Sequence, residues 1–176
     1  MKHGISRFLL IGTLLTTACN GASIQGEAFS SETGEFRVET PAPFEETQQA
    51  IQTPVGPVEI HTFTAEAEDS AYVIAYSDYP SAIVEETNPQ ALLDSSRDGA
   101  VTNLGGTLLS EEAVEIDGYP GRSLVISTGA ETDEPATISS RIYLVDNRLY
   151  QVLVVIPEGK NVEKAAAGFL ESFALE

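Results

Sequence analysis

The spacing of apolar residues along this chain predicts both strands and helices. Tyr72, Ile74 and Tyr76 alternate with smaller residues, which is the period-two pattern of a strand with one buried face. Residues 148–156 are apolar on both faces apart from Gln151, and we expect them to form a central strand covered on both sides, with Val152, Leu153 and Val154 buried. Strands are predicted over 36–39, 46–53, 58–64, 71–79, 107–116, 119–128, 137–145 and 148–156.

Two helices are predicted from capping signals and a 3.6-residue apolar period. Asn88-Pro89 starts the first, which runs to Asn103 and ends at Gly105-Gly106. Asn161 caps the second. Its apolar stripe consists of Val162, Ala165, Ala166, Phe169, Leu170 and Phe173.

Two-residue turns join neighbouring strands into hairpins. Asp117-Gly118 and Asp146-Asn147 both stand between β-rich runs, and the second turn sets Tyr143 opposite Tyr150. The resulting order is hairpins, helix, hairpins, helix. This order predicts an α+β domain in which one antiparallel sheet is flanked by packed helices.

The first 18 residues have the layout of a secretory signal peptide. A short basic segment precedes an apolar run over 8–15, which is too short to span a membrane, and small residues follow. Cys19, the only cysteine, comes next in LLTTAC, which resembles a bacterial lipoprotein signal. We therefore predict a lipid on Cys19. The alternative is ordinary cleavage after Ala18, which leaves a free thiol.

The charge of the exported part is strongly acidic. From Cys19 onward, all 27 acidic residues face only seven basic ones, a balance of −20. This field disfavours nucleic acid and anionic lipid surfaces as direct partners. It favours a cationic partner, or high-salt surroundings in which an acidic surface keeps the protein soluble. Residues 20–35 are rich in Gly, Ser and Ala and predict a flexible tether after the cysteine at 19, which leaves 36–176 as a single domain.

Several segments resemble the PsbP-like group of domains, which shares its fold with Mog1-type proteins. They are DGYPGRSLVIS with Gly121-Arg122, RIYLVDNRLYQVLVVIP from Arg141 through Tyr150, FLESF with Ser172-Phe173, and the opening FRVETPAPF. The resemblance implies an α/β/α sandwich without enzymatic activity. Some relatives are lumenal accessory or assembly proteins of photosystem II, including lipid-anchored cyanobacterial ones.

Candidate chemistry is sparse. His61 is the only histidine after the leader, so a hydrolase would have to use it as the base, and no G-x-S-x-G elbow surrounds any serine. Counting histidines and cysteines excludes the usual zinc sites. The acidic clusters lack the spacing of a calcium loop. We predict a structural role for His61, with no metal and no cofactor.

Arg141, Tyr143, Arg148 and Tyr150 share one face of the last hairpin and form the candidate interaction surface. The alternative is that the tyrosines pack beneath a helix while the arginines pair with acids. The sequence thus predicts an exported accessory or binding protein, tethered by lipid and facing the periplasm, a lumen or the cell exterior, with a possible protein partner in the envelope. A role beside a photosynthetic or other membrane complex and a hydrolase using His61 are the alternatives.

Overall fold

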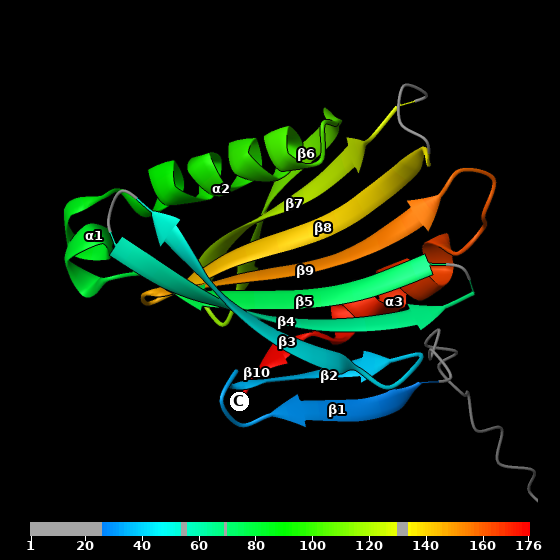
Figure 1. The fold of residues 1–176 in the computed structure, drawn as a ribbon, viewed down its shortest axis with the longest axis horizontal. Helices are drawn as coiled ribbons and strands as arrows, with labels where there is room; N and C mark the ends of the chain where they lie inside the picture. Colours follow the sequence, from blue (N-terminus) through cyan, green and yellow to red (C-terminus); the bar gives the residue numbers. More distant parts are fainter. Residues whose placement is uncertain (1–25, 54–55, 69, 130–133) are drawn as a thin grey trace, which may run out of the picture.

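The computed structural model describes residues 26–176 apart from 54–55, 69 and 130–133. Within these residues the chain forms ten strands and three helices, shown in Figure 1. The strands are β1 (Glu27–Ser31), β2 (Phe36–Thr40), β3 (Glu45–Thr53), β4 (Gly56–Ala67), β5 (Ser70–Asp78), β6 (Thr107–Ile116), β7 (Tyr119–Ser127), β8 (Ala136–Val145), β9 (Arg148–Pro157) and β10 (Ala174–Leu175). The helices are α1 (Ser81–Glu86), α2 (Pro89–Asn103) and α3 (Glu163–Ser172).

A seven-stranded antiparallel sheet organises the fold. Its order is β3-β4-β5-β9-β8-β7-β6, and a smaller sheet has the order β1-β2-β10. Helix α3 and the small sheet pack on one face of the large sheet, whereas α2 packs on the other face over β7 and β8 (Figure 1). The described chain is therefore an α+β domain with layers on both sides of one antiparallel sheet, as predicted.

Strand β9 lies in the middle of the sheet, between β5 and β8. This confirms the central position predicted from its apolar sequence. Val152 and Val154 are fully buried on the α3 side. Leu153, on the opposite face, is only partly buried, so its predicted burial is wrong in degree. The reason is that α2 covers β7 and β8 and leaves much of this face of β9 uncovered.

The N-terminal boundary of the domain differs from the prediction. The predicted leader, Cys19 and the first part of the tether lie outside the described residues. Residues 27–31, however, form β1 and pair with β2 from Glu27–Thr40 to Ser31–Phe36. Phe29 holds this strand on the domain, because its ring packs against two others. The ring centres lie 5.0 Å apart for Phe44 and 5.6 Å apart for Phe63. The tether assigned to 20–35 is therefore too long, and the ordered domain begins before Phe36.

The local signals for helices and turns are largely confirmed. The Asn88 side chain accepts a hydrogen bond from the N–H of Gln90 at 2.8 Å, and Gly105 beyond the end of α2 has a φ of 57°. Asp117 and Gly118 take positive φ in the β6–β7 turn. Helix α3 departs from the prediction, because its N-cap is the buried Val162 and not Asn161, and no side chain caps it.

Candidate functional site

The two tyrosines of the predicted interaction surface belong to the core. Tyr143 is 4% exposed and Tyr150 is 2% exposed. The ring of Phe173, which follows α3, stacks on Tyr143 at 6.1 Å and meets Tyr150 edge-on at 5.5 Å. The prediction of an exposed aromatic surface is therefore wrong, because the chain after α3 folds back over the last hairpin. The alternative interpretation, in which both tyrosines are packed in the core, is the correct one.

Arg148 ties the β1–β2 turn to the large sheet. Its Nε and Nη2 donate to the two carboxylate oxygens of Asp78 at 2.6 and 2.9 Å. Its Nη1 donates to the carbonyl of Thr33 at 3.0 Å and to Oε2 of Glu35 at 3.2 Å. The guanidinium lies 4.6 Å from the ring centre of Tyr76. A planar group with five donors can hold these partners together, and we call this arrangement the Arg148 clamp.

Two groups beside Arg148 have shifted pKa values, for different reasons. The hydrogen bond from Arg148 holds the pKa of Asp78 below its ordinary value. Burial raises the pKa of the Tyr150 phenol, whose hydroxyl donates to the carbonyl of Gly34 at 2.7 Å. Both groups thus keep their usual charge at neutral pH, which suits a structural joint.

Arg141 caps a helix. Its Nη1 donates to the carbonyl of Leu170 in the last turn of α3 at 3.0 Å, where a positive charge also favours the helix dipole. Its Nε is buried and has no hydrogen-bond partner among the described residues. Unlike Arg148, Arg141 pairs with no carboxylate in the described part of the chain, so its predicted pairing with an acid is wrong.

His61 lies against an aromatic ring. It stacks on Tyr76 with ring centres 4.6 Å apart and planes at 5°. Its Nδ1 is buried and lies 3.9 Å from Oε1 of Glu46, which is beyond hydrogen-bond distance. Neither ring nitrogen hydrogen-bonds to a hydroxyl of the described residues. These contacts are those of a packed strand residue.

The acidic side chains that the structure describes do not converge on one point. No group of three or more His, Cys, Asp or Glu side chains in the described ranges is placed to hold a metal ion. Asp69, Glu131 and Asp133 of the predicted clusters lie outside the described residues. Where the structure describes the chain, no helix is long and apolar enough to cross a bilayer.

An ion-pair network that the sequence analysis missed joins α2 to β6 and β7. The carboxylate of Glu111 lies 3.0 Å from Nη1 of Arg97 and 2.9 Å from Nε of Arg122. Oδ1 of Asp94 lies 3.2 Å from Nη1 of Arg97 and 3.4 Å from Nη2 of Arg122. Gln90 accepts from Arg122 as well. The spacing of Asp94 and Arg97 on one helix face was the available signal. The network fixes α2 on the sheet. It also engages Arg97 and Arg122, two of the seven basic residues after the predicted leader.

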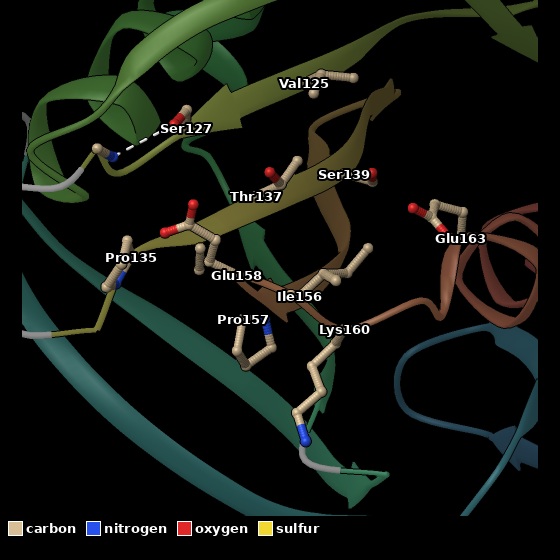
Figure 2. Close-up of a pocket in the computed structure, with 13 residues that line it drawn as sticks. Val125, Ser127, Pro135, Thr137, Ser139, Ile156, Pro157, Glu158, Lys160 and Glu163 are labelled. Atoms are coloured by element: carbon tan, nitrogen blue, oxygen red, sulfur yellow. Dashed lines mark hydrogen bonds between the residues drawn. The ribbon is translucent and has the colours of Figure 1, made fainter.

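A groove of about 510 Å³ opens where the ends of β7, β8 and β9 meet the loop before α3 (Figure 2). Ser127, Thr137 and Ser139 contribute hydroxyls to its wall, and Ile156 contributes apolar surface. Glu163 stands at the α3 side. The groove has the mixed lining of ordinary domain surface, without a convergent set of charges.

Charge is unevenly distributed along the chain. Residues 38–96, which hold β3, β4, β5 and α1, contain no lysine or arginine. Their 11 acids are Glu39, Glu45, Glu46, Glu59, Glu66, Glu68, Asp69, Asp78, Glu85, Glu86 and Asp94. This half of the large sheet therefore has no cation of its own to offset its carboxylates except through Arg148, which comes from β9.

The fold is of the PsbP type. The solution structure of cyanobacterial PsbP (CyanoP) from Synechocystis sp. PCC 6803 matches with a TM-score of 0.58, at 14% sequence identity, over 90% of this chain and 98% of that chain. At this identity the likeness establishes the fold alone, and it confirms the PsbP-like architecture expected from the sequence motifs. No family model and no curated protein matches the chain. The relation to Mog1-type proteins and the lipid on Cys19 stay predictions.

Proposed function

We propose that this protein is an exported, lipid-anchored accessory protein that binds another protein of the cell envelope and performs no chemistry itself. The supporting observation is the use of its arginines. Arg97, Arg122, Arg141 and Arg148 are all engaged by groups of the domain itself, so the PsbP-like fold turns a predominantly acidic surface outward. Such a surface suits recognition of a basic protein, whereas no constellation of side chains described above suits catalysis.

Strand β1 limits how far the domain can stand from its anchor. If Cys19 carries the lipid, only seven residues separate it from Glu27, the first residue of β1. That link spans at most about 25–30 Å when fully extended. The domain would therefore work close to the membrane. Figure 1 shows that β1 begins at the end of the molecule where β4 ends and β8 begins, so this end would lie nearest to the membrane.

The anchor is tested by Cys19→Ser. We expect the wild-type protein to sediment with membranes, with a mature N-terminus at a lipid-modified Cys19 by mass spectrometry. Cys19→Ser should move it to the soluble fraction, because two or three acyl chains hold a protein firmly and none remain. Asn20→Ser serves as the matched control and should stay with the membranes. A soluble wild-type protein with a free thiol would contradict the proposal.

A narrower role beside a photosynthetic complex is the second candidate, favoured by the likeness to a cyanobacterial PsbP. Its test is capture from detergent-solubilised membranes with the tethered protein as bait, followed by identification of the bound proteins. Subunits of such a complex would support this role, and their absence from the source membranes would remove it. Activity on a panel of esters and peptides that His61→Ala abolishes would instead establish the hydrolase alternative.

A further inference from the structure

The free edge of β3 is a candidate site for another strand. β3 is the outermost strand of the large sheet and pairs only with β4 (Figure 1). Its residues from Glu45 to Gln52 are all exposed. Strands at the edge of a sheet present unpaired N–H and C=O groups, which can pair with an added strand.

The pairing register identifies the groups that face outward. Gln52 pairs with Pro57, which has no N–H to donate, so we take this pair as a non-hydrogen-bonded one. The hydrogen-bonded pairs then alternate along the ladder. The residues whose N–H and C=O point away from β4 are therefore Glu46, Gln48, Ala50 and Gln52.

The two edges of the large sheet differ in how they are protected. β6, at the other edge, carries an irregularity between Leu108 and Ser110 that breaks its register. β3 keeps a continuous register from Glu45 to Thr53 and contains no proline, glycine or lysine. Bulges, prolines and lysines are the usual means by which proteins prevent edge pairing. β3 uses none of them over nine residues.

Charge selects among the possible occupants. A second copy of this chain would bring another domain with a balance of −20 against the half of the sheet that has no lysine or arginine of its own. Glu45 and Glu46 on β3 and Glu59 on β4 would face a cationic strand favourably. We propose that β3 accepts an extended, Lys- or Arg-bearing segment of a partner protein as an eighth strand. This inference rests on the proposed binding function and gives it a site.

The test uses the full chain and a nine-residue peptide of alternating lysine and valine, with capped ends and a fluorescent label. Two further peptides separate the contributions: one has alternate backbone nitrogens methylated, and the other has glutamate in place of lysine. The key variant is Ala50→Pro, which removes one outward N–H and spares the pairing with β4. Ala50→Thr keeps that N–H and is the matched control.

We expect the lysine peptide to bind the wild type and Ala50→Thr equally and to slow hydrogen exchange of the β3 amides. Binding should weaken by about tenfold or more with Ala50→Pro and with the methylated peptide, because both remove main-chain hydrogen bonds. The glutamate peptide should not bind. If Ala50→Pro lowers the melting temperature of the domain strongly, Gln48→Lys replaces it, with the same weakening expected from charge repulsion.

Equal binding of the methylated peptide would overturn the inference, because it would show diffuse charge attraction without strand pairing. No binding of the lysine peptide, or a self-association that Ala50→Pro abolishes, would overturn it too. These outcomes are independent of the anchor test. If the wild-type protein is soluble with a free Cys19 thiol and still binds the peptide at β3, the proposed membrane role is refuted and the strand site is supported.

Discussion

The two faces of the large sheet are closed in different ways. On the α3 side, an aromatic cluster that includes Phe36, Phe63 and Phe169 is sealed by elements from both ends of the chain. On the α2 side, an aliphatic cluster around Leu93 is covered by a single helix over β7 and β8. The first face therefore joins β1 and β2 to α3 and β10, whereas the second leaves the outer strands β3 and β4 largely open. Stability should depend mainly on the first face, and the proposed strand binding on the free edge of β3.

The largest effect should come from the aromatic face. Phe36→Ala removes a fully buried ring that contacts Phe29, Phe63 and Phe173, and we expect it to lower the free energy of unfolding by about 3–5 kcal/mol. Leu109→Ala is the control, since Leu109 is 60% exposed, and should cost within about 0.5 kcal/mol. Urea unfolding measures both. Similar losses for the two variants would mean that the cluster is not the centre of the fold.

The comparison is sharpened by two leucines on the α2 side. Leu93→Ala, at a fully buried position on the sheet-facing side of α2, should cost about 2–5 kcal/mol. Leu153→Ala, on the partly covered face of β9, should cost about 1–2 kcal/mol, because folding removes less apolar surface from water at Leu153 than at Leu93. Urea unfolding measures the loss of stability in both variants. Equal costs would show that the cover of this face extends beyond β7 and β8.

The features that the sequence predicts well are those with a local cause. The central position of β9 follows from its two apolar faces, and the start of α2 follows from Asn88. β1 was missed because residues 27–31 read as a polar linker, and Phe29 becomes ordered only through rings that are distant in sequence. The facing of Tyr143 and Tyr150 was predicted correctly, but their cover depends on Phe173, which tertiary packing alone places.

The smallest effect concerns acid stability and the Arg148 clamp. Because the pKa of Asp78 is lower in the folded protein than its ordinary value of 3.8, this carboxylate stabilises the fold fully above that value. The stabilisation is lost as the pH falls through the lower folded-state pKa. Asp78→Asn should therefore be less stable than wild type at pH 7, and the difference should shrink below about pH 4. Unfolding curves across this range provide the measurement, and a constant difference at every pH would contradict the pairing.

If the chain is anchored at Cys19 as proposed, strand β1 also determines how the domain responds to tension on its N-terminal side. Glu27 pairs with Thr40 at the end where the chain enters the domain, so a pull there would open the five pairs of the hairpin one after another, like a zipper. Five released residues lengthen the link by about 17 Å. The opening would then stop at the turn that Arg148 grips through Thr33 and Glu35. If the protein is anchored and bound to a partner as proposed, a pull between the two would be absorbed by one strand, while the seven-stranded sheet keeps its shape.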